Sequence, residues 1–167
     1  MPDAGKRRLL AYSVARNMVL MDVATKPLKA DVVRIAAAAR AALEDLTPSQ
    51  KGMHFAAVNA IASVAVVELM GRLILEQLGR TGRKVIGYRH PSLGLLPVPH
   101  AWLEIDDLII DLTHDRFDGT GLVGWVFEQT AWHASFSKEV LALCFKPWLF
   151  WPYATCAMVS SACEAAK

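Results

Sequence analysis

The stretch His100–Thr113, HAWLEIDDLIIDLT, decides the fold that the sequence predicts. Apolar residues alternate along the chain on both sides of Asp106-Asp107. Aspartate tolerates the positive φ that a two-residue hairpin turn requires. The sequence therefore predicts an antiparallel β-hairpin with strands at 100–105 and 108–113.

The register of this hairpin sorts its side chains onto two faces. Trp102 is expected opposite Asp111, which makes His100 a diagonal neighbour of Asp111 at about 7–8 Å between backbones. One face then carries His100, Trp102, Asp111 and Thr113. The other face is wholly aliphatic and is expected in the core; it consists of Leu103, Ile105, Leu108, Ile110 and Leu112.

An imidazole next to a carboxylate can do acid–base chemistry. The carboxylate of Asp111 would fix which ring nitrogen of His100 carries the proton, and would support the imidazolium that forms when the other nitrogen takes a proton. The alternative is a purely structural His–Asp hydrogen bond on a half-exposed sheet.

The chain upstream of the hairpin has helical patterns. Apolar residues make up 54% of the protein and charged residues 20%, which predicts a folded globular chain. We expect one helix at 6–20, a second after Pro27 and a third from Thr47 to about Leu78, ended by Gly79. The third is apolar nearly all round between 55 and 70, which is typical of a helix buried on most sides.

Strand patterns replace the helical ones after Gly82. We expect a strand at 84–90, the hairpin, a short strand around 125–128 and helical segments to the end. Helices followed by an antiparallel sheet predict an α+β fold with a buried central helix packed on the sheet. We expect one domain over 1–167, with N-terminal helices (1–46), a core (47–115) and an aromatic-rich C-terminal part (116–167).

The hairpin resembles a segment of a known superfamily. His-Ala-Trp, an apolar alternation and then Ile-Asp-Leu-Thr is similar to the pattern of the transglutaminase-like superfamily, with close relatives among bacterial and phage cysteine-hydrolase-like proteins. The resemblance covers roughly residues 50–115, including KVIGY at 84–88 as the strand before the histidine strand. It implies a papain/transglutaminase-like fold, His100 as catalytic base, Asp111 as its orienting acid and Trp102 as the aromatic residue after the histidine.

The family's nucleophile is missing from its expected place. The resemblance implies a cysteine near the start of the central helix, but residues 1–99 contain none. In one account, Asn59 or Ala60 occupies the vacated position, by evolution or by deliberate mutation. In a second, Ser63 substitutes as nucleophile, and in a third Cys144 reaches the site from the C-terminal side.

Other chemistries have weaker signals. His90, His100, His114, His133 and Asp115 are metal-ligand types, but no pair of histidines has the helical i,i+4 spacing of a zinc site, and the three cysteines form no CxxC pair. We therefore expect no metal and no cofactor. The aromatic residues of the C-terminal part are expected to fill the core, the alternative being an apolar groove for a peptide or acyl group; they include Trp125, Trp132, Trp148, Trp151 and Tyr153.

Charge and hydropathy bear on location and partners. The apolar run after Lys6 is cut by Arg16 and Asn17 without a signal-peptide cleavage site, and the longest apolar run, 55–67, is shorter than the about 20 residues a membrane span needs. We therefore expect a cytoplasmic protein without a membrane span. A nucleic-acid surface usually needs a dense basic cluster with interleaved aromatic residues. The nearest one here is thin, so we expect no nucleic-acid partner; it consists of Arg80, Arg83, Lys84 and Arg89.

Two functions follow from these patterns. The first is a thiol hydrolase or acyl transferase acting on an amide or ester bond of a protein or peptide, in a form without its usual upstream cysteine. The second is a non-catalytic binding or inhibitor protein built on the same scaffold.

Overall fold

The computed structural model describes residues 28–47, 50, 59–94 and 99–167, with the side chains of 59–62 left out. The chain divides into two compact units, 1–32 and 33–167. The described part of the first unit is the start of a helix over residues 28–44. The helix predicted at 6–20 lies wholly outside the described residues, and the predicted helix start at Thr47 to Ser49 lies partly outside them.

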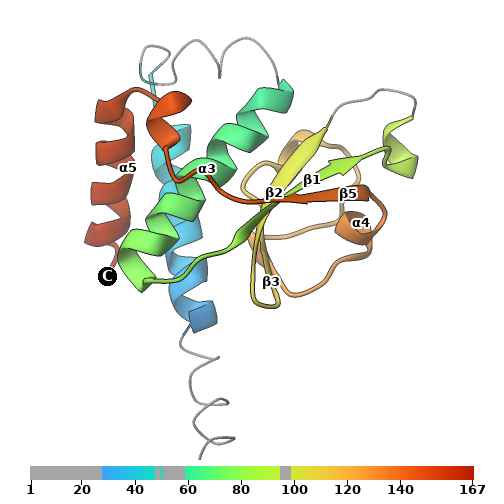
Figure 1. Ribbon diagram of the computed structural model, residues 1–167, viewed down its shortest axis with the longest axis horizontal. Helices are drawn as coiled ribbons and strands as arrows, with labels where there is room; N and C mark the ends of the chain where they lie inside the picture. The colour runs from blue at the N-terminus through green and yellow to red at the C-terminus, as the bar shows by residue number, and fades with distance from the viewer. Residues whose placement is uncertain (1–27, 48–49, 51–58, 95–98) are drawn as a thin grey trace, which may run out of the picture. The chain divides into compact units, whose positions relative to one another are not determined.

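A five-stranded antiparallel sheet forms the centre of this unit, in the order β4-β3-β2-β1-β5 (Figure 1). The strands are β1 (Arg83–Tyr88), β2 (His100–Ile105), β3 (Leu108–Ile110), β4 (Val126–Phe127) and β5 (Ser137–Leu141). Together with the helices they make an α+β fold, as the sequence predicts.

The predicted hairpin register is confirmed. Leu103 pairs with Ile110 and Ile105 with Leu108, around a two-residue turn in which Asp106 has a φ of 51°. The second strand ends at Ile110, three residues before the predicted end. It ends there because the carboxylate of Asp111 accepts a hydrogen bond from the backbone N–H of Thr113, which turns the chain away from β2.

Helix α3 (Asn59–Leu78) packs on one face of the sheet, mainly against β2. Its inward side chains are almost completely buried; Leu69, Met70, Leu73 and Ile74 are each no more than 1% exposed. The helix ends where Gly79 takes a left-handed φ of 63° and donates its N–H to the carbonyl of Leu75. The predicted buried central helix is therefore confirmed, with its predicted end.

Helix α5 (Tyr153–Ala165) lies on the same side of the sheet as α3 and contacts it (Figure 1). Its Cys163 thiol donates a weak hydrogen bond to the carbonyl of Ile35 in the helix of residues 28–44. A further short helix, α4 (Ala131–Ala134), lies beyond the sheet on the other side. Single 3-10 turns occur at Pro91–Leu93, His114–Arg116 and Pro147–Leu149.

The second face of the sheet is covered by an aromatic cluster. It consists of Val85, Trp102, Ile109, Trp132 and Phe136, with Leu93, Phe117, Leu122 and Phe127 packed around them. Much of the cluster comes from the chain between β3 and β5, which folds back over the sheet face that carries His100, Trp102 and Asp111. That face was expected to be half-exposed in the structural alternative, but it is buried, and the aromatic cluster forms a second core layer on it.

Two strands differ from the predicted elements. The segment 137–141 was predicted helical, but it is strand β5 and pairs with β1. Its side chains are mostly exposed, so it lacks the alternation that identifies a half-buried strand. Strand β1 ends at Tyr88, two residues early, because Arg89 takes a left-handed φ of 55° and His90 caps the following turn. No helix in the described ranges is long and apolar enough to cross a membrane.

Candidate functional site

His100 and Asp111 meet as the register predicts. The Nε2 atom of His100 lies 2.6 Å from Oδ2 of Asp111. Both side chains are buried, with exposures of 2% and 1%. His100 opens β2 and Asp111 directly follows β3, so two neighbouring strands position the pair. The sequence-predicted pair is thus brought into direct contact.

A third residue, which the sequence pattern did not reveal in this role, joins the pair. Nε2 of His133 lies 3.0 Å from the same Oδ2 atom, and its side chain is completely buried. His133 is carried by α4, whose N-cap is Thr130. The site is therefore a buried cluster of His100, Asp111 and His133, called the His–Asp–His cluster below.

Thr113 completes the surroundings of the carboxylate. Its backbone N–H and its hydroxyl donate to Oδ1 of Asp111 at 2.9 and 3.2 Å. The backbone N–H of Asp111 donates to the carbonyl of Trp125 beside β4. Both carboxylate oxygens are therefore held in place, and each has donors directed at it.

These donors determine the charge of the cluster. Burial by itself raises the pKa of Asp111, but electrostatic interaction and hydrogen bonding with His100 and His133 outweigh it and hold that pKa well below the usual range. Burial lowers the pKa of His133 in spite of its hydrogen bond to Asp111, so this imidazole is neutral at pH 7. An ionised carboxylate only accepts, so both Nε2 atoms donate to it.

The two imidazoles differ in their second nitrogen. Nδ1 of His133 lies 2.7 Å from the hydroxyl of Thr130, which also accepts the backbone N–H of His133 and so turns its own proton towards Nδ1. For Nδ1 of His100 the described residues provide no hydrogen-bond partner. His100 is therefore the member of the cluster with a lone pair left for chemistry.

Aromatic rings enclose His100. Phe117 and Trp132 approach it edge-on, with ring centroids at 5.0 and 5.4 Å. Trp102 and Phe136 lie at 5.9 and 6.1 Å. Trp102, predicted to line the site, also contacts the ring of His133 at 4.9 Å. This apolar enclosure strengthens the electrostatic interactions within the cluster.

The candidate nucleophile positions lie on α3. Ser63 is buried, and its hydroxyl accepts a hydrogen bond of 3.1 Å from the backbone N–H of Ala101, next to His100 in β2. Asn59 and Ala60 form the start of α3, one turn before Ser63, and their side chains fall outside the described residues. The start of α3 therefore lies at the end of the sheet where His100 lies.

Cys144 has a different partner. Its thiol donates to the buried carboxylate of Glu68 at 3.1 Å, and Lys84 bonds to the other oxygen of Glu68 at 2.6 Å. Burial and the hydrogen bond to Glu68 raise the pKa of this thiol. Lys84 and Glu68 lie on the α3 face of the sheet, whereas His100 faces the aromatic cluster. The cysteines that the structure describes are thus not paired with His100.

The two other described histidines have separate roles. Nε2 of His90 donates to the carbonyl of Trp132, while its Nδ1 accepts from the hydroxyl and backbone N–H of Ser92. His114 donates from Nε2 to the carbonyl of Gly124 at 2.7 Å, and its buried Nδ1 has no partner within the part of the chain that the structure describes. Neither belongs to the His–Asp–His cluster.

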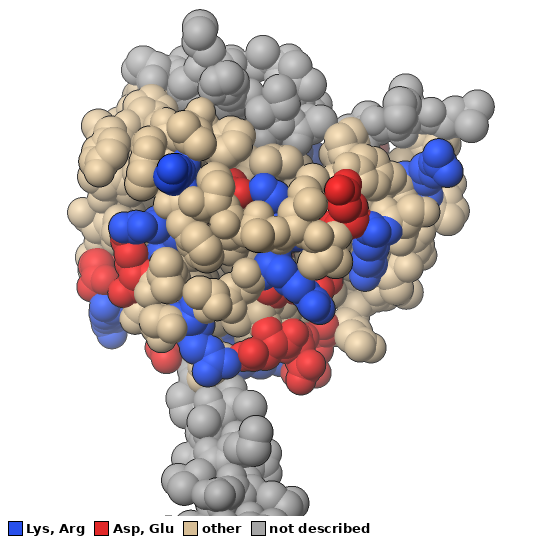
Figure 2. Space-filling view, in the orientation of Figure 1, with Lys and Arg blue, Asp and Glu red and all other residues tan. Residues whose placement is uncertain are grey.

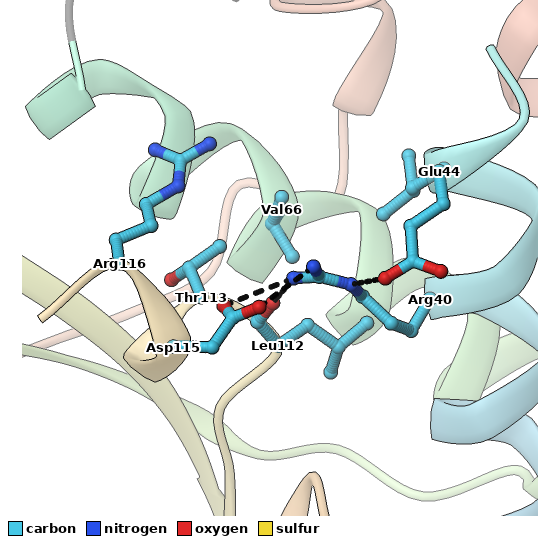
Figure 3. Close-up of a pocket in the computed structure, with 8 residues that line it drawn as sticks. Arg40, Glu44, Val66, Leu112, Thr113, Asp115 and Arg116 are labelled. Carbon is cyan, nitrogen blue, oxygen red and sulfur yellow. Dashed lines mark hydrogen bonds and ion pairs between the residues drawn. The ribbon is translucent and has the colours of Figure 1, made fainter. Parts of the chain in front are cut away.

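A small open pocket lies beside Thr113, between the helix of residues 28–44, α3 and the segment after β3 (Figure 3). Arg40 lies across it between Glu44 and Asp115, with ion-pair distances of 2.7 and 2.8 Å. Arg40 also donates to the carbonyl of Leu112, and its guanidinium stacks 4.6 Å from the centroid of Trp125. Asp115 is thereby bound to Arg40 rather than to a histidine.

Ion pairs engage Arg80, Arg83 and Lys84 of the thin basic cluster in the sequence. Arg80 pairs with Asp106, and Arg83 pairs with Glu104 at 3.1 Å. On the face drawn in Figure 2, basic and acidic side chains are intermixed rather than segregated. This face therefore presents no broad field of a single sign.

The register could reveal His100 and Asp111, but His133 lies 22 residues beyond Asp111 in a region without a clear pattern. Compared with models of known protein families, with curated proteins and with solved structures, the chain gives no match.

Proposed function

We propose that this chain is a transglutaminase-like, papain-type thiol hydrolase or acyl transferase for amide or ester bonds, in a form that lacks its usual upstream cysteine. His100 acts as general base and Asp111 orients its ring. One observation carries the proposal: Nε2 of His100 donates to a buried carboxylate, while Nδ1 has no partner among the described residues.

The chemistry follows from this arrangement. With the proton fixed on Nε2, the lone pair on Nδ1 can accept a proton from a nucleophile. The carboxylate of Asp111 then stabilises the imidazolium that forms, as in other nucleophile–histidine–carboxylate sites. His133 and Thr113 hold that carboxylate in position. A thiol at the start of α3 would be the group that this base activates.

Two features support this assignment. A buried central helix packs on an antiparallel sheet, and Ser63 joins α3 to the backbone beside His100. The side chain of His100 faces the aromatic cluster, so a thiol at the start of α3 would reach it around the end of the sheet. We place the vacated nucleophile position at Asn59 or Ala60. The expected partner is a protein or peptide, and the expected location is the cytoplasm.

The proposal is tested by restoring the thiol. Asn59→Cys and Ala60→Cys are made separately in a chain with Cys144→Ser, Cys156→Ser and Cys163→Ala, and alkylation by iodoacetamide is timed at pH 7 in the presence of a chelator. One of the two new thiols is expected to react at least about tenfold faster than the same thiol combined with His100→Gln.

The matched control is the chain that keeps Cys144 alone, whose thiol is bonded to Glu68 instead of a histidine. Its rate is expected to be unaffected by His100→Gln. If neither new thiol responds to His100→Gln, His100 is not a base for the start of α3 and the proposal is wrong.

A second candidate, a non-catalytic binding or inhibitor protein, is favoured by the enclosure of His100 under aromatic rings and by the absence of cysteine from residues 1–99. It predicts that His100→Gln, once shown to be folded, still captures the same binding partner as the unmodified chain. Loss of capture by that folded variant contradicts this candidate.

A further inference from the structure

The His–Asp–His cluster also has the composition of a metal site. One ligand atom from each residue, Nε2 of His100, Oδ2 of Asp111 and Nε2 of His133, lies within 4.8 Å of the others. All three side chains are buried. The ligands come from β2, the end of β3 and α4, so they share no local spacing and the sequence pattern predicted no metal.

The donor set selects a class of ion. Two imidazoles and one carboxylate are three protein ligands of the kind that hold catalytic zinc, with a fourth position left for a further ligand. Imidazole nitrogen suits Zn²⁺ and neighbouring transition ions, whereas Ca²⁺ and Mg²⁺ prefer all-oxygen surroundings. The described cluster contains no thiolate.

The neighbours of these three residues already orient them. Thr113 holds Oδ1 of Asp111, which leaves Oδ2 directed at the two imidazoles. The hydroxyl of Thr130 lies 2.7 Å from Nδ1 of His133 and therefore directs Nε2 towards Asp111. Outer hydrogen bonds of this kind, one on the carboxylate and one on the far imidazole nitrogen, are typical of metal sites.

A small opening of the cluster would admit an ion. The two N–O distances are 2.6 and 3.0 Å. Tetrahedral Zn²⁺ with bonds of about 2.0–2.1 Å needs ligand atoms about 3.3 Å apart. The contact between His133 and Asp111 then has to widen by about 0.3 Å and that between His100 and Asp111 by about 0.7 Å. His133 lies on a helix of four residues and His100 on the first residue of β2, so these shifts move no long element.

We propose that this chain binds one Zn²⁺ through His100, Asp111 and His133. The imidazole protons move from Nε2 to Nδ1 on binding, so that His133 donates to the hydroxyl of Thr130. The Nδ1 atom of His100 then carries a proton and has no lone pair. Zn²⁺ occupancy and the use of His100 as a base therefore exclude one another, while Zn²⁺ binding itself does not depend on the proposed function.

The test measures Zn²⁺ affinity by competition with a colorimetric chelator, using the full chain with Cys144→Ser. We expect one ion per chain. In His133→Gln the Zn²⁺ affinity is expected to fall by at least about 100-fold. His114→Gln is the matched control, because His114 is a buried histidine outside the cluster, and it is expected to leave the affinity unchanged. Absence of binding, or equal affinity in both variants, overturns the proposal.

The outer hydrogen bond and a cobalt spectrum give readouts that do not require the His133 variant to fold. Thr130→Val is expected to weaken binding roughly tenfold, whereas Thr130→Ser, which keeps the hydroxyl, is expected to bind like the parent chain. Co²⁺ bound to the parent chain is expected to give the intense visible bands of a four-coordinate ion, which Zn²⁺ removes. Absence of those bands, or an equal affinity of the two Thr130 variants, contradicts the proposal.

Discussion

At the scale of single residues, Asp111 makes hydrogen bonds to more residues of the site than either histidine does. Its carboxylate accepts hydrogen bonds from His100, from His133 and from both the N–H and the hydroxyl of Thr113. A buried charge with this many donors is stable only while they remain in place. The position of Asp111 therefore links β2, the end of β3 and α4.

We predict that Asp111→Asn lowers the free energy of unfolding by roughly 3 kcal/mol. The amide keeps the shape of the side chain but puts an NH2 group opposite imidazole donors, so that at least one donor loses its acceptor. Urea denaturation of the metal-free chain measures the change. Asp107→Asn, in the exposed hairpin turn, is the control and is expected to change stability little; equal effects at the two positions would contradict the account.

The three cysteines are predicted to differ in reactivity. Burial raises the pKa of Cys163 to about 11, two units above the ordinary value of 9.0. At pH 8 its thiolate fraction is therefore about 100-fold lower than that of an ordinary thiol, and only the thiolate reacts. Timed alkylation followed by mass spectrometry should show exposed Cys144 modified first and half-buried Cys156 next.

Cys163 is expected to stay unmodified in the folded chain and to react as fast as the other two in guanidinium chloride. Labelling of Cys163 at the rate of Cys144 without denaturant would show that α5 does not bury it as described.

The residues of the site could be predicted to different extents. A two-residue turn fixes a register, and a register fixes which side chains are neighbours, so the contact between His100 and Asp111 follows from local sequence. His133 depends on how the chain between β3 and β5 folds back over the sheet. That path is set by packing of the aromatic cluster, and packing leaves no periodic signal in one sequence.

At the scale of elements, a close contact between β1 and the aromatic cluster makes a glycine necessary. A Cβ atom at Gly87 would lie 2.6 Å from Cγ of Phe136 and 2.7 Å from Cζ3 of Trp102. Gly87 pairs with His100 in the sheet, so this contact is directly beside the site. Both neighbours are rigid rings in a buried layer and yield little.

We predict that Gly87→Ala destabilises the protein by about 1–3 kcal/mol through overpacking. Phe136→Leu should destabilise it separately by creating space. The double variant is expected to lose less unfolding free energy than the two single variants lose in total, because the leucine leaves room for the new methyl group. Urea denaturation of the four chains measures this coupling, and strictly additive effects would show that the two residues do not touch.

The helices and strands could be predicted where one face of the element, or nearly all of it, consists of buried apolar side chains. Helix α3 and the β2–β3 hairpin have apolar patterns long enough to identify, and both are confirmed. Strand β5 was missed because it is an edge strand with mostly exposed side chains, so its conformation depends on backbone pairing with β1. Pairing of that kind depends on the partner strand and leaves no apolar alternation in the sequence.

At the scale of the whole molecule, the sheet separates two layers with different chemistry. On one face, α3, α5 and the part of the helix of residues 28–44 from Val33 onward form an aliphatic layer that includes the bonds between Glu68, Lys84 and Cys144. On the other, the aromatic cluster encloses the His–Asp–His cluster. Folding therefore removes ionisable groups from water, and the stability of the whole chain depends on pH.

The direction of that dependence follows from His133 and Asp111. The pKa of His133 is lowered below its ordinary 6.5 in the folded chain, so below about pH 6.5 the unfolded chain binds more protons than the folded one. The stability associated with His133 is therefore complete above pH 6.5 and is lost as the pH falls below that value. Asp111 also has a lowered pKa, so its contribution is lost only below about pH 4, as the acid form appears in the unfolded chain.

We predict that the free energy of unfolding of the metal-free chain falls between pH 7.5 and pH 5.5 by up to about 1.4 kcal/mol per pH unit for this one proton. Urea denaturation at several pH values in a chelating buffer measures the slope. His133→Gln keeps a hydrogen-bond donor near Asp111 but does not titrate, so its slope in this range is expected to be smaller. A slope that is the same with glutamine, or a stability that rises on acidification, would mean that His133 is not held neutral within the fold.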